Sequence, residues 1–366
     1  MKIKQNLVFV LGALLLLLLL PLIGIWLTGR PISQYLEFPP MTRYVEHAPF
    51  SWFVFIALVL GMAVITLPFV SRVFGRRKLA PAAPAPVRPF PYWGWLSVLT
   101  GIISWILAWT RFSWFAPFQL YTFTPLWFSY ILFINALTFR RTGRCMLTGR
   151  PRFFFLLFPV SAVFWWFFEY LNRFVQNWYY VGEESFTKLE YVLLATLAFS
   201  TVLPAVLGTY EFLKTRPRVS AGLAGFAPVR ICKPRAFAWT ALVISGVGLA
   251  LIGVCPDFLF PLLWLSPLII ITALQAIKGE ETIFSPLEKG DWSRIYTLAL
   301  SALICGFFWE MWNYLSMAKW IYEVPFVSRF KLFEMPALGY FGYLPFGLEC
   351  ALIGDILLRP RGAGDH

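Results

Sequence analysis

The sequence predicts an all-α, polytopic integral membrane protein with about ten transmembrane helices, in which an N-terminal helix pair precedes two parallel four-helix repeats. The first reason is composition: 59% of the 366 residues are hydrophobic and 13% are charged, against roughly 25% charged residues in soluble domains. The second is that several apolar runs reach the ~20 residues needed to cross a bilayer. These runs are continuously apolar, whereas the strands of a membrane barrel alternate.

Each candidate span is an apolar run between two polar or basic loops. The ten spans are 6–28, 48–70, 92–110, 119–138, 153–171, 189–213, 236–254, 258–277, 295–315 and 332–358. The first span follows Lys2 and Lys4 and could be a signal peptide. Its apolar run is longer than the usual 7–15 residues and no A-x-A site follows it, so we expect an uncleaved anchor.

The basic residues predict how the chain is oriented in the membrane. Roughly three quarters of the 31 Lys and Arg residues lie in one of the two alternating sets of loops, as the positive-inside rule requires of cytoplasmic loops. Both termini belong to that set. We therefore expect the N-terminus and the C-terminus to be cytoplasmic, and the net charge of +13 to reflect topology and not a nucleic-acid partner.

Two basic, proline-containing linkers divide the chain. Segments of this composition favour extended backbone over helix. The predicted organisation is a two-helix segment at 1–70, a cytoplasmic linker at 71–91, a first repeat at 92–213, a second linker at 214–235, a second repeat at 236–358 and a cytoplasmic tail at 359–366.

The two blocks of four spans share landmarks in the same order. FTPLWFSYILFINAL (123–137) is similar to FPLLWLSPLIIITAL (260–274), and WFFEYLN (166–172) is similar to FFWEMWN (307–313). WYY (178–180) then corresponds to WIY (320–322). An even number of spans per copy makes the repeats parallel, related by an axis along the membrane normal.

The polar residues of both repeats are predicted to meet at one depth, near the outer leaflet. Glu169 and Asn172 end one span and Glu310 and Asn313 end its counterpart, and a spacing of three places each pair on one helix face. Acids open the two following spans. The predicted catalytic residues are Glu169, Glu310, Glu190 and Glu334, and the predicted substrate-binding residues are Asn172, Asn313, Trp178, Tyr180, Trp320 and Tyr322.

These residues also have a purely structural interpretation. Trp and Tyr anchor helices at membrane interfaces whatever the function. Acids at helix N-termini, as expected for Glu190 and Glu334, interact favourably with the helix dipole. Glu169 and Glu310 lie instead near helix C-termini, where a negative charge is unfavourable, so we expect either a functional role or pairing with a cation.

The residue inventory argues against a metal or cofactor. There are two histidines and five cysteines, and no C-x-x-C pair occurs. No phosphate-binding loop and no dinucleotide-binding fingerprint is present. We expect no metal site, no cofactor and no nucleic-acid partner.

Three functions remain open. The first is a membrane enzyme that acts on a lipid or isoprenoid, in which an acid protonates a double bond, a second carboxylate recovers the proton and aromatic faces stabilise the cation. The second is a transporter or lipid flippase built on parallel repeats. The third is a non-enzymatic assembly or scaffold protein, which would be favoured if Glu169 and Glu310 paired with Lys or Arg and left no cavity.

The motifs also resemble those of a known family. WYY (178–180) with Glu190, and WIY (320–322) with FEMP (333–336), are similar to the tandem helical units of the lycopene cyclase domain, although the P-x-E-E pair of that family is missing. The resemblance implies proton-initiated cyclisation of an isoprenoid. The overall pattern also resembles an uncharacterised family of bacterial polytopic membrane proteins, which implies the bacterial inner membrane. The sequence does not determine the oligomeric state.

Overall fold

The computed structural model describes residues 2–40, 42–78 and 86–358. Within them, seven helices are long and apolar enough to cross a membrane, and a bent pair, Ser113–Tyr121 with Phe123–Thr142, makes an eighth if it forms one span. The prediction of a mostly helical protein with several apolar helices long enough to span a membrane is therefore confirmed. The count of ten is not, because two further apolar helices are shorter than 18 residues. Residues 79–85 of the first predicted linker and the 359–366 tail lie outside the described residues.

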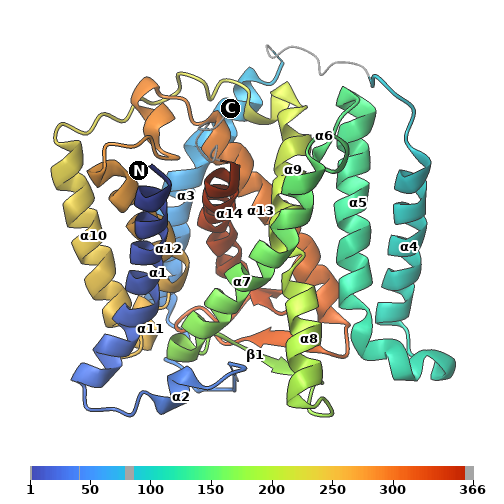
Figure 1. Cartoon of the computed structure of the whole chain (residues 1–366), viewed down its shortest axis with the longest axis horizontal. Helices are drawn as coiled ribbons and strands as arrows, with labels where there is room; N and C mark the ends of the chain where they lie inside the picture. Colours follow the sequence, from blue (N-terminus) through green and yellow to red (C-terminus); the bar gives the residue numbers. More distant parts are fainter. Residues whose placement is uncertain (1, 41, 79–85, 359–366) are drawn as a thin grey trace.

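Helices account for nearly all the regular structure (Figure 1). Up to the end of the first predicted repeat, the elements are α1 (Lys2–Leu27), α2 (Ser33–Leu36), α3 (Trp52–Arg76), α4 (Tyr92–Trp109), η1 (Ser113–Tyr121), α5 (Phe123–Thr142), α6 (Met146–Gly149), α7 (Pro151–Val175), β1 (Trp178–Val181), α8 (Lys188–Phe199) and α9 (Val202–Lys214). After it come η2 (Pro217–Ser220), α10 (Pro234–Ala250), α11 (Pro256–Leu259), α12 (Leu262–Ile277), η3 (Ser285–Lys289), α13 (Ser293–Tyr314), β2 (Lys319–Tyr322), β3 (Lys331–Leu332), β4 (Met335–Pro336), η4 (Ala337–Gly342) and α14 (Tyr343–Leu358).

The long helices run roughly side by side between two ends of the molecule (Figure 1). At one end α1 begins and α14 ends, and the basic loop that joins α9 to α10 lies there; we call it the basic end. Strands β1 and β2 lie at the opposite end, which we call the strand end (Figure 1). The connections that follow α7 and α13 therefore meet at the same end of the bundle.

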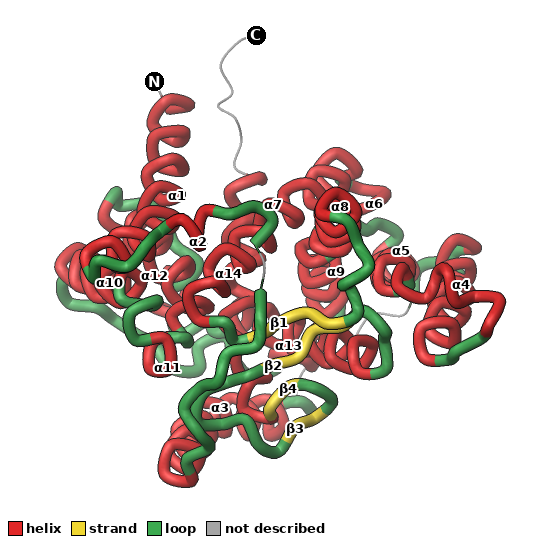
Figure 2. Tube along the Cα trace, turned by 90° about the horizontal axis from the view of Figure 1, so that it is seen from below, coloured by secondary structure: helices red, strands yellow, loops and turns green. Residues whose placement is uncertain are grey.

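Strands β1 and β2 form an antiparallel ribbon across the strand end (Figure 2). Tyr179 lies opposite Ile321, with Trp178 opposite Tyr322 on one side and Tyr180 opposite Trp320 on the other. The register is thus symmetric about its central pair. This pairing joins the end of α7 to the end of α13 through backbone hydrogen bonds.

Large aromatic side chains fill the centre of the bundle. Trp127 and Phe168 are fully buried. The Phe168 ring stacks on Trp264 at 5.1 Å, and the Trp127 ring lies 4.9 Å from Trp309. These contacts join α7 to α12 and α5 to α13, and Phe346 of α14, which packs against both Trp264 and Trp309, connects the two pairs into one core.

The helical run from Lys188 to Lys214 is interrupted in its middle. Helix α8 ends at Phe199 and α9 begins at Val202. The Ser161 hydroxyl of α7 donates to the Phe199 carbonyl at 2.6 Å and accepts from the Leu203 amide at 3.0 Å. A break inside a membrane leaves backbone groups unpaired, so this serine supplies the partners that the break removes.

Two predicted boundaries are corrected by the structure. The linker predicted at 71–91 is helical as far as Arg76, because its prolines begin only at Pro81. The span predicted at 332–358 becomes helical only at Tyr343. Its first residues form the β3–β4 hairpin and η4, and Phe333 in the hairpin turn adopts a φ of 59°, which ends any helix at that point.

Candidate functional site

The side chain of Glu169, near the end of α7, is completely buried. One of its oxygens, Oε1, accepts three hydrogen bonds, from the indole N–H of Trp165 at 3.0 Å, the indole N–H of Trp178 at 3.1 Å and the Tyr180 hydroxyl at 2.6 Å. Trp165 lies one turn earlier on α7, whereas Trp178 and Tyr180 belong to β1. The carboxyl group thus ties the strand to the helix that precedes it.

Glu310, near the end of α13, occupies the equivalent position and is also completely buried. Its Oε1 accepts from the Tyr322 hydroxyl of β2 at 2.9 Å and from the Tyr343 hydroxyl of α14 at 2.6 Å. The indole N–H of Trp320 lies near this carboxyl group but outside hydrogen-bonding geometry.

The two carboxyl groups lack cationic partners. Neither Glu169 nor Glu310 forms an ion pair with a described Lys or Arg, and Oε2 of each has no hydrogen-bond partner among the described residues. All their hydrogen bonds come from tyrosine hydroxyls and indole N–H groups. Each carboxyl group therefore lies in a pocket of neutral donors.

The two asparagines hold the strands in place. Asn172 donates from Nδ2 to the Trp178 carbonyl at 2.8 Å, and its Oδ1 accepts from the Asn177 amide at 2.8 Å. Asn313 donates to the Trp320 carbonyl at 2.8 Å and accepts from the Trp320 amide at 2.9 Å. Both side chains therefore pair with backbone groups in or next to the ribbon, and neither is among the residues that line the cavity described below. Their role in substrate binding stays a prediction.

A cavity of about 350 Å³ lies beside the two carboxyl groups, and its walls are mostly apolar. Trp165, Trp178 and Tyr180 line it from the Glu169 side, and Tyr322 and Tyr343 line it from the Glu310 side. The carboxyl groups themselves do not line it. They lie behind this aromatic wall and reach the cavity through the hydroxyl and indole groups that hydrogen-bond to them.

Burial keeps the donors in this wall protonated. Tyr180 and Tyr322 belong to the ribbon, and burial, reinforced by the adjacent carboxyl groups, raises the pKa of both phenols well above the usual value. The phenols therefore remain O–H donors throughout the physiological pH range.

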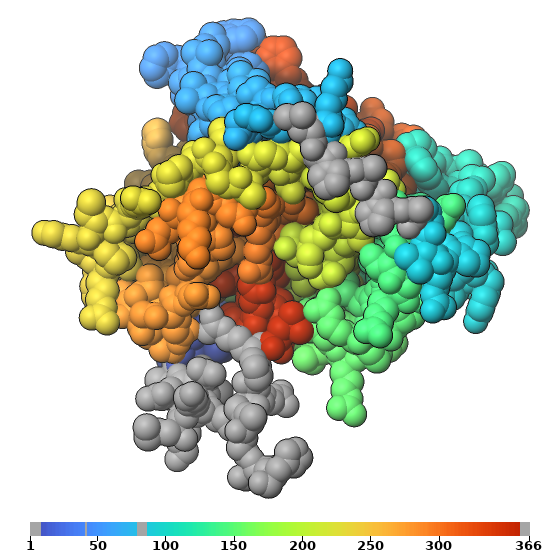
Figure 3. Space-filling model, turned by 90° about the horizontal axis from the view of Figure 1, so that it is seen from above, coloured from blue at the N-terminus to red at the C-terminus, as the bar shows by residue number. Residues whose placement is uncertain are grey.

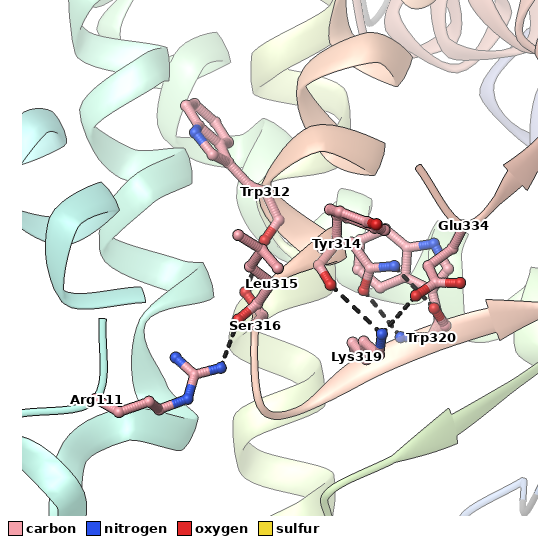
Figure 4. Close-up of polar contacts among 9 residues, drawn as sticks. Arg111, Trp312, Tyr314, Leu315, Ser316, Lys319, Trp320 and Glu334 are labelled. Atoms are coloured by element: carbon pink, nitrogen blue, oxygen red, sulfur yellow. Dashed lines mark hydrogen bonds and ion pairs between the residues drawn. The ribbon is translucent and has the colours of Figure 1, made fainter. Parts of the chain in front are cut away.

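Charged residues stand at one side of the cavity. Lys319 lines it and forms an ion pair with Glu334, while its ammonium group also donates to the Tyr314 carbonyl at 3.4 Å (Figure 4). Arg111 donates to the Leu315 carbonyl at 2.6 Å and holds the end of α13 against the α4 side of the molecule (Figure 4).

Glu183, in the loop after β1, also lines the cavity. Burial, with the nearby carboxyl groups of Glu169 and Glu184, raises the pKa of Glu183 to about 7.

The other two predicted catalytic acids do not join Glu169 and Glu310. Glu190 is exposed and forms a capping box with Thr187, accepting from the Thr187 amide and hydroxyl at 2.8 Å each. In this structure Glu190 therefore caps the N-terminus of α8, which is its structural interpretation. Glu334 was expected at a helix N-terminus; it lies instead in the β3–β4 turn, where it pairs with Lys319.

Several residues of the site were not predicted, among them Trp165, Tyr343 and Glu183. Trp165 lies four residues before Glu169, so helical spacing carried a signal for its contact. Tyr343 is 33 residues from Glu310, and no local pattern connects the two. Glu183 lies in a loop, where only the fold shows that it faces the cavity.

The described residues contain no group of three or more His, Cys, Asp or Glu side chains placed to hold a metal ion. Comparison with known proteins finds no matching family model, no matching curated protein and no matching solved structure. The resemblance to the lycopene cyclase domain therefore stays a prediction, and the case for a function depends on the geometry of the site.

Proposed function

We propose that this protein is a membrane enzyme that transfers protons to and from a lipid or isoprenoid chain held in the aromatic cavity. The observation that carries this proposal is the position of Glu169 and Glu310. Both carboxyl groups are buried without a cation, and each connects to an apolar cavity through a tyrosine hydroxyl. Intramembrane acids of this kind mark functional sites.

The site contains the parts that proton-initiated chemistry requires. The carboxylic acid on one side passes a proton through its tyrosine to a double bond, which becomes a carbocation. The carboxylate on the other side then takes a proton from a neighbouring carbon through its own tyrosine, so that the double bond moves or a ring closes. After the reaction the first acid has lost a proton and the second carboxylate has gained one. Transfer of that proton from the second group back to the first restores the starting state. General acid–base catalysis with neutral donors of this type suits a water-poor site.

The cavity walls suit a cationic intermediate. Trp165, Trp264, Trp309 and Tyr322 line the cavity, and aromatic rings attract a positive charge over their faces, most strongly where water is excluded. Their apolar surface equally favours a hydrocarbon chain. A scaffold protein would have no need of a cavity or of acids without counter-ions, so this arrangement favours the enzyme.

The same proposal includes the finer architecture. Ten helices cross the membrane, with α10 and α12 included, since the 17 residues of α10 extend over ~26 Å of a hydrocarbon core that is ~30 Å thick. The two repeats are related by a two-fold axis through the Tyr179–Ile321 pair. The symmetric register of the ribbon and the matching bonds of Asn172 and Asn313 support this relation. The basic end, with both termini, faces the cytoplasm of a bacterial cell.

The proposal is tested with Glu169→Gln and Glu310→Gln, which keep the shape of the side chain but cannot hold or accept the proton. Cells that carry either variant should accumulate a precursor lipid and lose its product, as read by mass spectrometry of membrane extracts. Glu211→Gln is the control, because Glu211 pairs with Arg150 at the basic end at 3.2 Å. Unchanged lipid profiles for both variants, at normal protein levels, would refute the enzyme and favour transport or a scaffold role.

A further inference from the structure

Helix α3 is held to the rest of the protein at its two ends. Near its start, the Ser51 amide donates to the Phe326 carbonyl at 3.0 Å. Near its end, Arg72 Nε donates to the Gly222 carbonyl at 3.0 Å. The helix lies at the edge of the bundle (Figure 2), and Val73 is the one residue of its 25 that is buried. Near its end the Phe69 ring packs against Trp292 at 5.0 Å. Because both ends are fixed, the helix is not free to move inward and close the space beside it.

An apolar groove of about 470 Å³ lies between α3 and the pair α13 and α14. Its lining side chains are almost all hydrocarbon or aromatic, and the hydroxyl of Thr66 is already bonded to the Met62 carbonyl of its own helix at 2.7 Å. Along this wall the lining residues extend from Trp292, just before α13, to Leu303, a rise of ~16 Å. That length is about half of a ~30 Å hydrocarbon core, which is the depth of one leaflet.

Helix α3, which forms one wall of the groove, continues past its last lining residue, Val70, into a cluster of cations towards the basic end. The sequence RVFGRRK (72–78) contains Arg72, Arg76, Arg77 and Lys78, and the last three are exposed. None of the four forms an ion pair with a described carboxylate. Figure 3 shows this end of α3, in blue, at the rim of the molecule beside the α9–α10 loop. A basic cluster directly after a membrane helix attracts anionic lipid head groups.

We propose that this groove is a binding site for one anionic phospholipid, with an acyl chain in the groove and the phosphate at the cations of Arg76 and Arg77. A lipid is favoured over a partner helix because the exposed cations that follow α3 have no carboxylate partner among the described residues, and an anionic head group supplies one. An acyl chain is narrow enough to lie in the groove. Because the groove is about as long as one leaflet is deep, the phosphate of such a lipid would lie at the basic cluster. The site is separate from the aromatic cavity and independent of the proposed activity.

The test is native mass spectrometry of the full-length protein, delipidated in detergent and then offered phosphatidylglycerol or phosphatidylcholine with the same acyl chains. The unmodified protein should retain one phosphatidylglycerol in strong preference to phosphatidylcholine. Arg76→Gln with Arg77→Gln should lower that preference about tenfold or more, and Arg72 is kept because it holds α3. The matched control is Arg140→Gln with Arg152→Gln, which removes the same charge from the basic end away from the groove.

Two further variants test where the acyl chain lies. Ala299→Phe on α13 and Thr66→Phe on α3 fill the groove from opposite walls and leave its cations unchanged. Each should abolish retention of phosphatidylglycerol, with thermal unfolding as a check that the protein is folded. An equal loss in the Arg140 and Arg152 control would overturn the proposal in favour of diffuse surface charge. Undiminished retention in either folded groove-filling variant would overturn the placement of the chain.

Discussion

The two buried carboxyl groups illustrate how similar motifs acquire different surroundings. Glu169 accepts three hydrogen bonds, from two indoles and one phenol, whereas Glu310 accepts two, both from phenols. The difference arises because Trp178 reaches its carboxyl group and Trp320 does not. The two sides of the cavity are therefore related but not equivalent, and single substitutions should distinguish them.

Tyr322→Phe should destabilise the protein more than Tyr180→Phe. Each change removes one donor from a buried carboxyl group, a loss worth about 1–3 kcal/mol. After the change Glu310 keeps only the Tyr343 hydroxyl, whereas Glu169 keeps both indoles. The comparison is made by thermal unfolding of the purified variants in one detergent. A larger loss in Tyr180→Phe would show that the count of donors does not set the stability of these sites.

Glu183 should make stability depend on pH. Its folded-state pKa of about 7 lies above the usual value of 4.5, so between these values the folded protein holds a proton that the unfolded chain releases. The contribution of Glu183 to stability is therefore fully present below pH ~4.5 and is lost as the pH rises through 7. Glu183→Gln should flatten this part of the profile and should leave the variant more stable than the unmodified protein at pH 8.

The profile is measured by thermal unfolding in detergent from pH 4.5 to 8. Glu281→Gln, in an exposed position of the loop after α12, is the control and should keep the original slope. If Glu183→Gln also keeps the original slope, another group is responsible for it.

Among the elements, the interrupted pair α8 and α9 is bridged by a single side chain. Ser161 of α7 bonds to backbone groups on both sides of the break. Phe199 and Val202, which border the break, also line the aromatic cavity. The interruption therefore contributes directly to the shape of the cavity. Ser161 of α7 joins the end of α8 to the start of α9 through its two hydrogen bonds.

Ser161→Ala should cost about 1–3 kcal/mol of the free energy of unfolding, because it leaves the buried Leu203 amide without a partner. Ser97→Ala is the matched control. Ser97 is equally buried, but it donates to the Gly94 carbonyl of its own helix at 2.7 Å, and removing it leaves no amide unpaired. Comparable losses in the two variants would contradict the role assigned to Ser161.

At the scale of the whole molecule, two exposed cysteines report the orientation in the membrane. Cys232 lies in the α9–α10 loop at the basic end, and Cys255 lies between α10 and α11 at the opposite end of α10. The other three cysteines, Cys145, Cys305 and Cys350, are buried. The protein therefore carries one natural marker at each end of the bundle.

In intact spheroplasts, a membrane-impermeant maleimide should label Cys255 and leave Cys232 unlabelled until the membrane is opened. Cys255→Ser should abolish labelling of intact spheroplasts, and Cys232→Ser should not change it. The reason is that basic loops are retained in the cytoplasm. Labelling of Cys232 from outside would reverse the proposed orientation.

The sequence by itself determined that the protein is mostly helical and rich in apolar helices long enough to span a membrane. Continuous apolar runs and few charges require a membrane, and spacing within a helix placed Glu169 beside Asn172 and Glu310 beside Asn313. These properties are local, because composition and helical periodicity act over a few turns. For the same reason the sequence indicated that the two acid–amide motifs would be found in similar surroundings.

Only the tertiary structure decided which groups touch. The bond from Tyr343 to Glu310, the pairing of β1 with β2 and the cavity beside them all join residues that are distant in the chain. Glu334 lies outside a helix, contrary to the prediction, because the chain turns back at Phe333. Phe333 has a backbone conformation that a bulky residue rarely adopts. Such contacts depend on how whole helices pack, because a buried polar group must find its partner wherever the fold supplies one.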